Sequence, residues 1–434
     1  MEIHTQDTVK TTEGMVLAHL KMLGSYKQAL GKIVESDQYM VPESALKVPF
    51  DEELLKTSKE IAEKYKKKAK VVILAGIGGS DMGVQALYEA LRGYKNTPGD
   101  SRPTLITYNT IEPKLLDEVD EVLKTYKNPE DVVLIVSSKS GTTTETITNA
   151  NILFNTFSKH FDEESASKQT VVVTTETSPL AESAREKNIT VVSFPEQIGG
   201  RFSVFSPVGI LPLSILGFNV DSFLEGARTA ITASTTEGKP SSAGVISAFL
   251  FEAYLQGSRV HELFIWNPEL EMLGKWYRQL LAESIGKTRE DETKIGLTPT
   301  LAIGSTDLHS VGQLIFGGRN DRFTTFVGAP HEWSGGSKYK KDSPFTLSVL
   351  EGKKSGEVIK AIYDGVKNTY KRDELPYISI ELTEINEREI GAFMALNMAV
   401  IMYLAQLFDV DAFDQPAVEL YKNEVRSILS KKEK

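Results

Sequence analysis

Hydroxyl side chains and one lysine crowd a short loop that is suited to holding an anion. The loop follows an apolar stretch at 132–137 and contains Ser138, Lys139, Ser140, Gly141, Thr142 and Thr143. A helical pattern begins near Thr142, and the free N–H groups at a helix N-terminus attract negative charge. A capping box between Thr142 and Glu145 is the structural alternative. Because a lysine stands among the hydroxyls directly after a strand-like stretch, we expect the loop to bind a phosphate, although the spacing of a Walker loop is absent.

A glycine-rich turn follows the first apolar stretch, at 71–75, and contains Gly76, Gly78, Gly79, Ser80, Asp81 and Gly83. Glycines allow a tight turn and a close approach of the backbone to a ligand. A dinucleotide-binding turn is disfavoured, because Asp81 occupies the third glycine position of its G-x-G-x-x-G pattern and no acidic residue ends the next stretch, at 105–108. A structural turn without any ligand is the alternative.

Glu283 is a candidate general base. In the helical pattern at 270–285 the apolar residues form one stripe, and Glu283 falls at its edge beside Trp276, where it is partly shielded from water. Gln279 lies one turn earlier on the same side and can hydrogen-bond a substrate. By spacing alone, an exposed i,i+4 ion pair with Lys287 is the more common arrangement.

Three further residues are candidates for holding charge or moving protons. Arg201 follows two glycines, and its permanent charge suits an anionic intermediate. His309 follows the stretch at 301–304, and an imidazole can both accept and donate a proton, which suits proton transfer. Lys422 lies in a helical pattern at 416–430. Taken alone, Arg201 is equally compatible with a structural ion pair, a lone histidine is usually structural, and Lys422 would be an ordinary surface lysine.

Strands and helices must position these residues. Apolar stretches rich in β-branched residues alternate with helical patterns, which is typical of parallel sheets covered by helices on both faces. The stretches lie at 71–75, 105–108, 132–137, 170–174, 191–194, 262–266, 301–304, 324–327 and 377–382. Ligands bind such sheets outside the carboxyl ends of the strands, where most of the motifs fall. The sequence therefore predicts an α/β fold with two doubly wound, mainly parallel sheets, extra N-terminal helices and a C-terminal helix.

We expect four segments along the chain. Residues 1–65 form an N-terminal helical segment, 66–235 a first α/β domain and 236–412 a second, and 413–434 form a C-terminal helical tail. A linker rich in Ser, Thr, Gly and Pro, at 233–242, marks the boundary between the two domains.

Composition narrows the class of protein. The 434 residues are 41% hydrophobic and 25% charged, as in soluble globular proteins, and the absence of cysteine excludes disulfides, thiolate metal sites and a cysteine nucleophile. A net charge of −10 argues against nucleic-acid binding. The six histidines have no paired spacing, so we expect no metal and no cofactor. The polar start and the lack of an uninterrupted membrane-spanning run predict no membrane partner and a cytoplasmic location.

Additional motifs complete a resemblance to a known family. They are the run at 199–206, the run Gln279-x-x-x-Glu283-Ser284-x-Gly286-Lys287, His309 within 304–309, and the run Gln415-Pro416-Ala417-Val418-Glu419-x-x-Lys422. With the two loops above, and in this order over residues 70–425, the chain resembles the sugar isomerase (SIS) domain family, in the shorter bacterial form of its branch that isomerises glucose 6-phosphate. Phe205, Ile285 and Ala417 depart from the usual pattern without removing a group expected to do chemistry.

The resemblance implies interconversion of glucose 6-phosphate and fructose 6-phosphate, a step of glycolysis and gluconeogenesis, by ring opening and proton transfer through an enediolate. It assigns Glu283 as the base, Arg201 to the enediolate, and His309 and Lys422 to ring opening. The implied substrate-binding residues are Gly79, Ser80, Ser138, Lys139, Ser140, Gly141, Thr142, Thr143, Gln279 and Gln415. It also implies a homodimer in which His309 reaches the neighbouring active site, without metal or cofactor.

Alternatives remain at this point. An isomerase that also accepts mannose 6-phosphate would keep Glu283 as its base and differ only in how the C2 face is held. A non-catalytic sugar-phosphate-binding regulator would keep the hydroxyl loop and lose the acid–base residues. The chain retains Glu283, Arg201, His309 and Lys422, which argues against a regulator. A dehydrogenase is the weakest alternative, because of Asp81.

Overall fold

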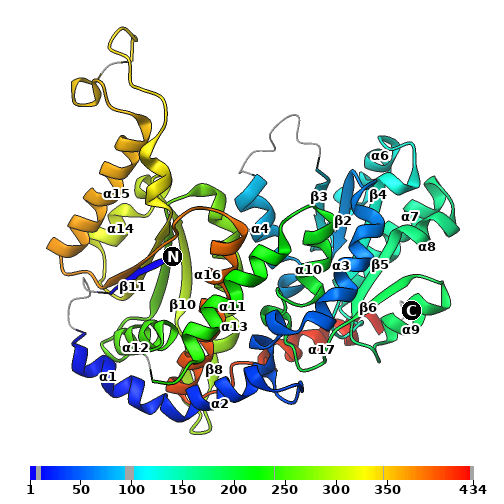
Figure 1. The fold of residues 1–434 in the computed structure, drawn as a ribbon, viewed down its shortest axis with the longest axis horizontal. Coiled ribbons are helices and arrows are strands. Elements are labelled where there is room, and N and C mark those ends of the chain that lie inside the picture. The colour runs from blue at the N-terminus through cyan, green and yellow to red at the C-terminus, as the bar shows by residue number, and fades with distance from the viewer. Residues whose placement is uncertain (6–10, 93–101, 239, 346, 431–434) are drawn as a thin grey trace.

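The computed structural model describes residues 1–5, 11–92, 102–238, 240–345 and 347–430. Two five-stranded sheets lie side by side with helices between and around them (Figure 1). Their strand orders are β3-β2-β4-β5-β6 and β1-β12-β11-β7-β10. The predicted fold class is confirmed.

The first sheet is parallel throughout. Its strands are β2 (Val71–Ala75), β3 (Thr104–Tyr108), β4 (Val132–Ser137), β5 (Thr170–Thr174) and β6 (Thr190–Ser193). β2, β4 and β5 are buried along their whole length, which explains their unbroken apolar sequences. The connections include the helices α4 (Met82–Arg92), α5 (Pro113–Asp117), α6 (Val119–Lys124), α7 (Thr144–His160), α8 (Glu163–Gln169) and α9 (Pro179–Glu186).

The second sheet is parallel except at one edge. Its parallel strands are β7 (Val260–Ile265), β10 (Thr298–Ile303), β11 (Arg322–Gly328) and β12 (Tyr377–Glu381). The short strand β1 (Glu2–His4) pairs antiparallel with β12. Residues 1–65 are mostly helical as expected, in α1 (Glu13–Met22), α2 (Gly24–Glu35) and α3 (Glu52–Lys66), but β1 was missed because three residues are too few to show a strand period.

The largest hydrophobic core lies between the two sheets and joins them. It takes in buried side chains of β2 and β7, such as Val72 and Leu263. Helices α10 (Pro207–Ile215), α11 (Val220–Thr235), α12 (Ser242–Leu255), α13 (Glu271–Ile285) and α16 (Glu387–Phe408) contribute about half of it. α16 is the one described helix long and apolar enough to cross a membrane. Of its apolar 18-residue stretch, 94% is buried inside the protein. Smaller cores cover the outer faces of the sheets, under helices such as α7 and α15 (Ser355–Arg372).

Candidate active site

A buried arginine and a half-exposed glutamate form the centre of the site. Arg201 lies in the short turn η5 (Gly200–Phe202) and is 4% exposed, whereas the side chain of Glu283, on α13, is 34% exposed. Nη1 of Arg201 donates to Oε2 of Glu283 at 3.1 Å. Burial lowers the pKa of Arg201 and the neighbouring carboxylate opposes that shift, so the guanidinium keeps its charge.

The guanidinium of Arg201 is anchored on every side. Its Nε donates to Oγ of Ser284 at 2.8 Å, and its Nη1 also donates to Oε1 of Gln415 at 2.9 Å. Its Nη2 donates to the carbonyl oxygens of Ala412, at 2.5 Å, and Asp414, at 3.0 Å. Arg201 thereby joins the first half of the chain to α13 and to the segment before α17 (Pro416–Ser430). The sequence analysis named Ser284 within a motif but gave it no role, although its place beside Glu283 was a signal.

Gln279 orients the other oxygen of Glu283. Its Nε2 donates to Oε1 of Glu283 at 3.0 Å, across one turn of α13. A side chain at Gly78 would meet this Nε2 at 2.7 Å, so the glycine makes room for the amide. The Oε1 atom of Gln279 is buried and has no hydrogen-bond partner among the described residues. A substrate hydroxyl would supply the missing donor, as the sequence suggested.

Lys287 does not form the exposed ion pair with Glu283 that spacing alone favoured. Its Nζ donates to Oδ1 of Asp414 at 2.5 Å and to the carbonyl oxygen of the same residue. α13 ends at Ile285, so Lys287 lies beyond the helix, in β8 (Lys287–Thr288), and the i,i+4 geometry is lost.

The glycine-rich turn η3 (Gly78–Ser80) packs directly against η5. A side chain at Gly79 would lie 2.1 Å from the carbonyl oxygen of Gly200, and Gly78 has a positive φ of 64°. The glycines therefore bring the turn against the loop that carries Arg201. Ser80, next to Gly79, stays half-buried at this junction.

Asp81, at the start of α4, is fully buried beneath that turn. Its Oδ2 accepts hydrogen bonds from Nδ2 of Asn109 at 2.8 Å and from Nε2 of Gln85 at 2.5 Å. Burial raises the pKa of Asp81 to about 6, and these hydrogen bonds counteract part of the shift. Asp81, which argued against a dinucleotide-binding turn, therefore connects the end of β3 to the start of α4. The sequence analysis missed this contact.

The hydroxyl loop lies at the end of β4, as predicted, but its details differ. α7 begins at Thr144, and Thr143, the residue before it, makes no side-chain capping bond. Because the helix starts after Thr142, the capping box with Glu145 does not form. Instead Oγ1 of Thr143 lies 3.1 Å from Oγ of Ser138, and Oγ1 of Thr142 donates to Oγ of Ser140 at 3.1 Å. The hydroxyls therefore gather at the N-terminus of α7 without being used up as its caps.

Two threonines at the end of β5 donate hydrogen bonds to the backbone of this loop. Thr174 donates to the carbonyl oxygen of Ser138 at 2.7 Å, and Thr175 donates to that of Lys139 at 3.1 Å. Gly141 has a φ of 65°, and a side chain there would meet Leu180 at 2.8 Å. These residues fix the backbone of the loop, and no local pattern indicated the two threonines in advance.

Lys139 connects the loop electrostatically to the centre. Burial lowers the pKa of Lys139, the charge of Arg201 lowers it further, and Glu196 acts in the opposite direction. A lysine and an arginine that feel each other's charge make this part of the site favourable for an anion.

The two residues assigned to ring opening are not bonded to the centre in the described chain. His309 is exposed in the turn η7 (Thr306–His309), which follows β10. Lys422, on α17, pairs with Glu419 of the same helix at 2.7 Å. No hydrogen bond or ion pair in the described residues joins either one to Glu283.

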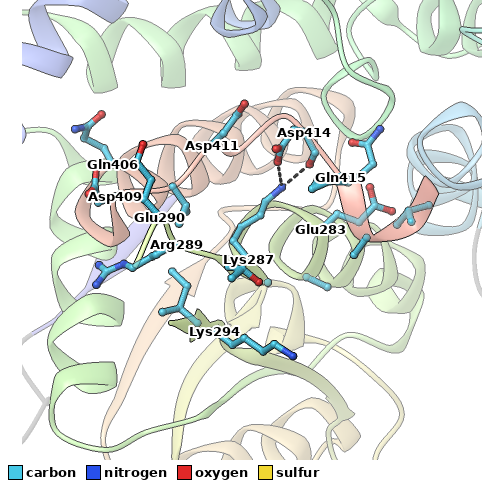
Figure 2. A pocket seen from close by; sticks show the side chains of 18 residues that line it. Glu283, Lys287, Arg289, Glu290, Lys294, Gln406, Asp409, Asp411, Asp414 and Gln415 are labelled. Atoms are coloured by element: carbon cyan, nitrogen blue, oxygen red, sulfur yellow. Dashed lines mark hydrogen bonds and ion pairs between the residues drawn. The ribbon is translucent and has the colours of Figure 1, made fainter. Parts of the chain in front are cut away.

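A pocket of about 1010 Å³ opens beside the centre and is lined by Glu283, Lys287, Asp414 and Gln415, among others. Figure 2 shows the carboxylate of Glu283 and the amide of Gln415 on one side of the Lys287–Asp414 pair. A carboxylate beside a fixed cation suits proton transfer through a negatively charged intermediate.

Solved structures share this architecture. A hypothetical protein from Thermus thermophilus superposes with a TM-score of 0.85 at 25% identity, over 99% of this chain and 100% of that chain. A glucose-6-phosphate isomerase from Chlamydia trachomatis superposes with a TM-score of 0.78 at 20% identity, over 97% of this chain and 87% of that chain. The fold defines an α/β protein of two five-stranded, mainly parallel sheets.

Sequence comparison gives the family within that class. A glucose-6-phosphate isomerase from Leptospira biflexa is 31% identical over 390 residues, which is 87% of this chain and 84% of that protein. The family model described as phosphoglucose isomerase matches residues 5–434. The chain belongs to the phosphoglucose isomerase family.

Proposed function

We propose that this chain interconverts D-glucose 6-phosphate and D-fructose 6-phosphate, with Glu283 as the group that moves the proton. The family supports the reaction. The observation that carries the assignment of the base is the pairing of Glu283 with the buried guanidinium of Arg201 at 3.1 Å.

The chemistry needs one carboxylate in two steps. With the sugar ring open, Glu283 takes the proton from C2 of glucose 6-phosphate and leaves an enediolate across C1 and C2. It then returns the proton to C1, which gives fructose 6-phosphate, while a hydroxyl proton passes between O1 and O2. The base is regenerated, and no oxidant or reductant is consumed.

The charge of Arg201 stabilises the enediolate. All its donors already have acceptors, so it acts through its fixed charge, or by exchanging the Nη1 bond to Glu283 for one to a substrate oxygen. Gln279 holds the carboxylate and offers its free Oε1 to a sugar hydroxyl. Gln415 accepts from the same Nη1 as Glu283 and is assigned to the same sugar.

The 6-phosphate is assigned to the hydroxyl loop, with Gly79 and Ser80 beside it. Ser138, Lys139, Ser140, Gly141, Thr142 and Thr143 supply the hydroxyls, the ammonium and the backbone at the N-terminus of α7. Neutral hydroxyls and N–H groups bind a dianion without a metal, and the lysine adds charge.

Ring opening is assigned to Lys422 and to His309 of a second copy of the chain. In this homodimer His309 completes the neighbouring site, which agrees with its exposure and with its lack of contact with Glu283 in the described residues. Large apolar side chains are exposed near His309, at Leu314, and along α17, at Leu420, Ile428 and Leu429. A second copy would cover such surface. The absence of cysteine agrees with a cytoplasmic location, which we propose on that basis.

A coupled assay tests the function. Purified protein should convert fructose 6-phosphate to glucose 6-phosphate without added metal or nucleotide. Turnover no higher than the uncatalysed background would reject the enzyme. The same assay with mannose 6-phosphate as product distinguishes an isomerase of wider range.

A further inference from the structure

A single lysine joins the end of α13 to the segment that leads into α17. Lys287 comes directly after the C-cap of α13, and its side chain is only 7% exposed. Its ammonium bonds both the carboxylate and the carbonyl oxygen of Asp414, as the dashed lines of Figure 2 show. A buried ammonium needs such partners, so the pair fixes Asp414 relative to α13.

The carbonyl oxygen of Asp414 is held twice. It accepts from Lys287 and, at 3.0 Å, from Nη2 of Arg201. The next residue, Gln415, accepts from Nη1 of the same arginine. Two cations from separate parts of the chain therefore converge on the backbone where α17 starts.

α17 has little else to fix it within the chain. None of its described residues is buried. The ion pair of Lys422 is made with Glu419, on the same helix, and so does not attach the helix to its surroundings. Within one copy of the chain, the position of Lys422 relative to Glu283 thus depends on the anchor at Asp414 and Gln415.

We propose that Lys287 is a positioning residue for the isomerase reaction. Through Asp414 it holds Gln415 and the start of α17 in place, and so sets where Lys422 lies relative to Glu283. Lys287 itself touches neither substrate nor the reacting atoms. The inference rests on the proposed function, because it presumes that Lys422 and Gln415 act on the sugar.

The first test is Lys287→Met. Methionine keeps most of the apolar stem and removes the charge, and Asp414, whose side chain is 50% exposed, stays solvated. We expect kcat to fall at least about tenfold, because small displacements of reacting groups are costly to rate. The inhibition constant of inorganic phosphate, as a competitor for the hydroxyl loop, should stay unchanged, since the variant leaves that loop intact.

The matched control is Lys294→Met. Lys294 lines the same pocket but is exposed, on β9 (Lys294–Ile295). Its kcat should stay within about twofold of the wild type, which shows that the loss at Lys287 does not come from removing positive charge near the pocket.

A second variant, Asp414→Asn, keeps the test decisive if Lys287→Met folds poorly. Its kcat should fall in the same direction, and the double variant should be no slower than the slower single variant, because both changes break one contact. Fully additive losses, a Lys287→Met enzyme within about twofold of the wild type, or an equal loss of phosphate affinity would overturn the inference. Those results leave the proposed function intact, whereas an inactive wild type would reject the function itself.

Discussion

The guanidinium of Arg201 lies 3.1 Å from the carboxylate of Glu283, although 82 residues separate the two in the sequence. The arginine comes from a loop after the first sheet, and the glutamate from a helix between the sheets. A buried cation with every donor occupied cannot move easily, so it fixes the place where a carboxylate and a sugar must meet.

Replacing both Ser138 and Thr143 by alanine should raise the KM for fructose 6-phosphate at least about tenfold and change kcat much less, because two phosphate-binding hydroxyls are lost far from the reacting carbons. Steady-state kinetics measure the two constants. Thr156→Ala, near the C-terminal end of α7, is the control, since its hydroxyl donates to the carbonyl oxygen of Ile152 in the same helix. An unchanged KM in the double variant would place the phosphate outside this loop.

As pH increases, the affinity for sugar phosphate should begin to weaken at a lower pH than it would if Lys139 had the pKa of an exposed lysine. Burial and Arg201 lower the pKa of Lys139, so the ammonium loses its charge at a lower pH than an exposed lysine, and KM rises as pH increases through that range. At pH values below that range the ammonium of Lys139 is charged and KM is constant. Lys139→Met should have a higher KM without this alkaline rise. An identical alkaline rise in the variant would assign the titration to another group.

Asp81 should make stability fall as pH rises. Its pKa is raised from 3.8 to about 6 in the folded protein, so the folded state binds more protons than the unfolded state between these values. Asp81→Asn removes this dependence. The difference in unfolding free energy between variant and wild type should shift in favour of the variant by up to about 3 kcal/mol between pH 4 and pH 7. Urea unfolding at both pH values measures it, and a constant difference would contradict the buried, shifted carboxyl.

The strand pattern and the limits of a few helices were predictable from the sequence. Fully buried strands such as β4 are unbroken apolar runs, and α17 starts at Pro416 as expected because proline favours the first turn of a helix. The late start of α7 at Thr144 was not predictable, because three consecutive threonines offer equivalent starting points.

Local signals in the sequence indicate candidate members of the site, but they do not give the contacts between them. Hydroxyls after a strand and a carboxylate at the edge of an apolar stripe are local signals. The bonds from Arg201 to Ala412 and Asp414, and from Lys287 to Asp414, span 211, 213 and 127 residues and depend on how the two halves pack. Local periodicity carries no information about such distances.

Mixed dimers test the origin of His309. Glu283→Gln and His309→Ala should each be nearly inactive as homodimers. When they are unfolded together and refolded in equal amounts, half of the molecules become heterodimers with one intact site, so activity should recover to about a quarter of the wild type. No recovery would mean that His309 acts within its own subunit or not at all. A double variant that carries both changes, refolded with itself, is the inactive control.

The most direct test of the account is the fate of the C2 proton in Glu283→Gln. In D₂O the wild type should introduce solvent deuterium at C1 of fructose 6-phosphate and C2 of glucose 6-phosphate, as NMR detects. The variant keeps the shape of the side chain but cannot take a proton, so exchange and isomerisation should fall about a thousandfold or more while fructose 6-phosphate still binds. Exchange near the wild-type rate in this variant would contradict the assignment of Glu283 as the base.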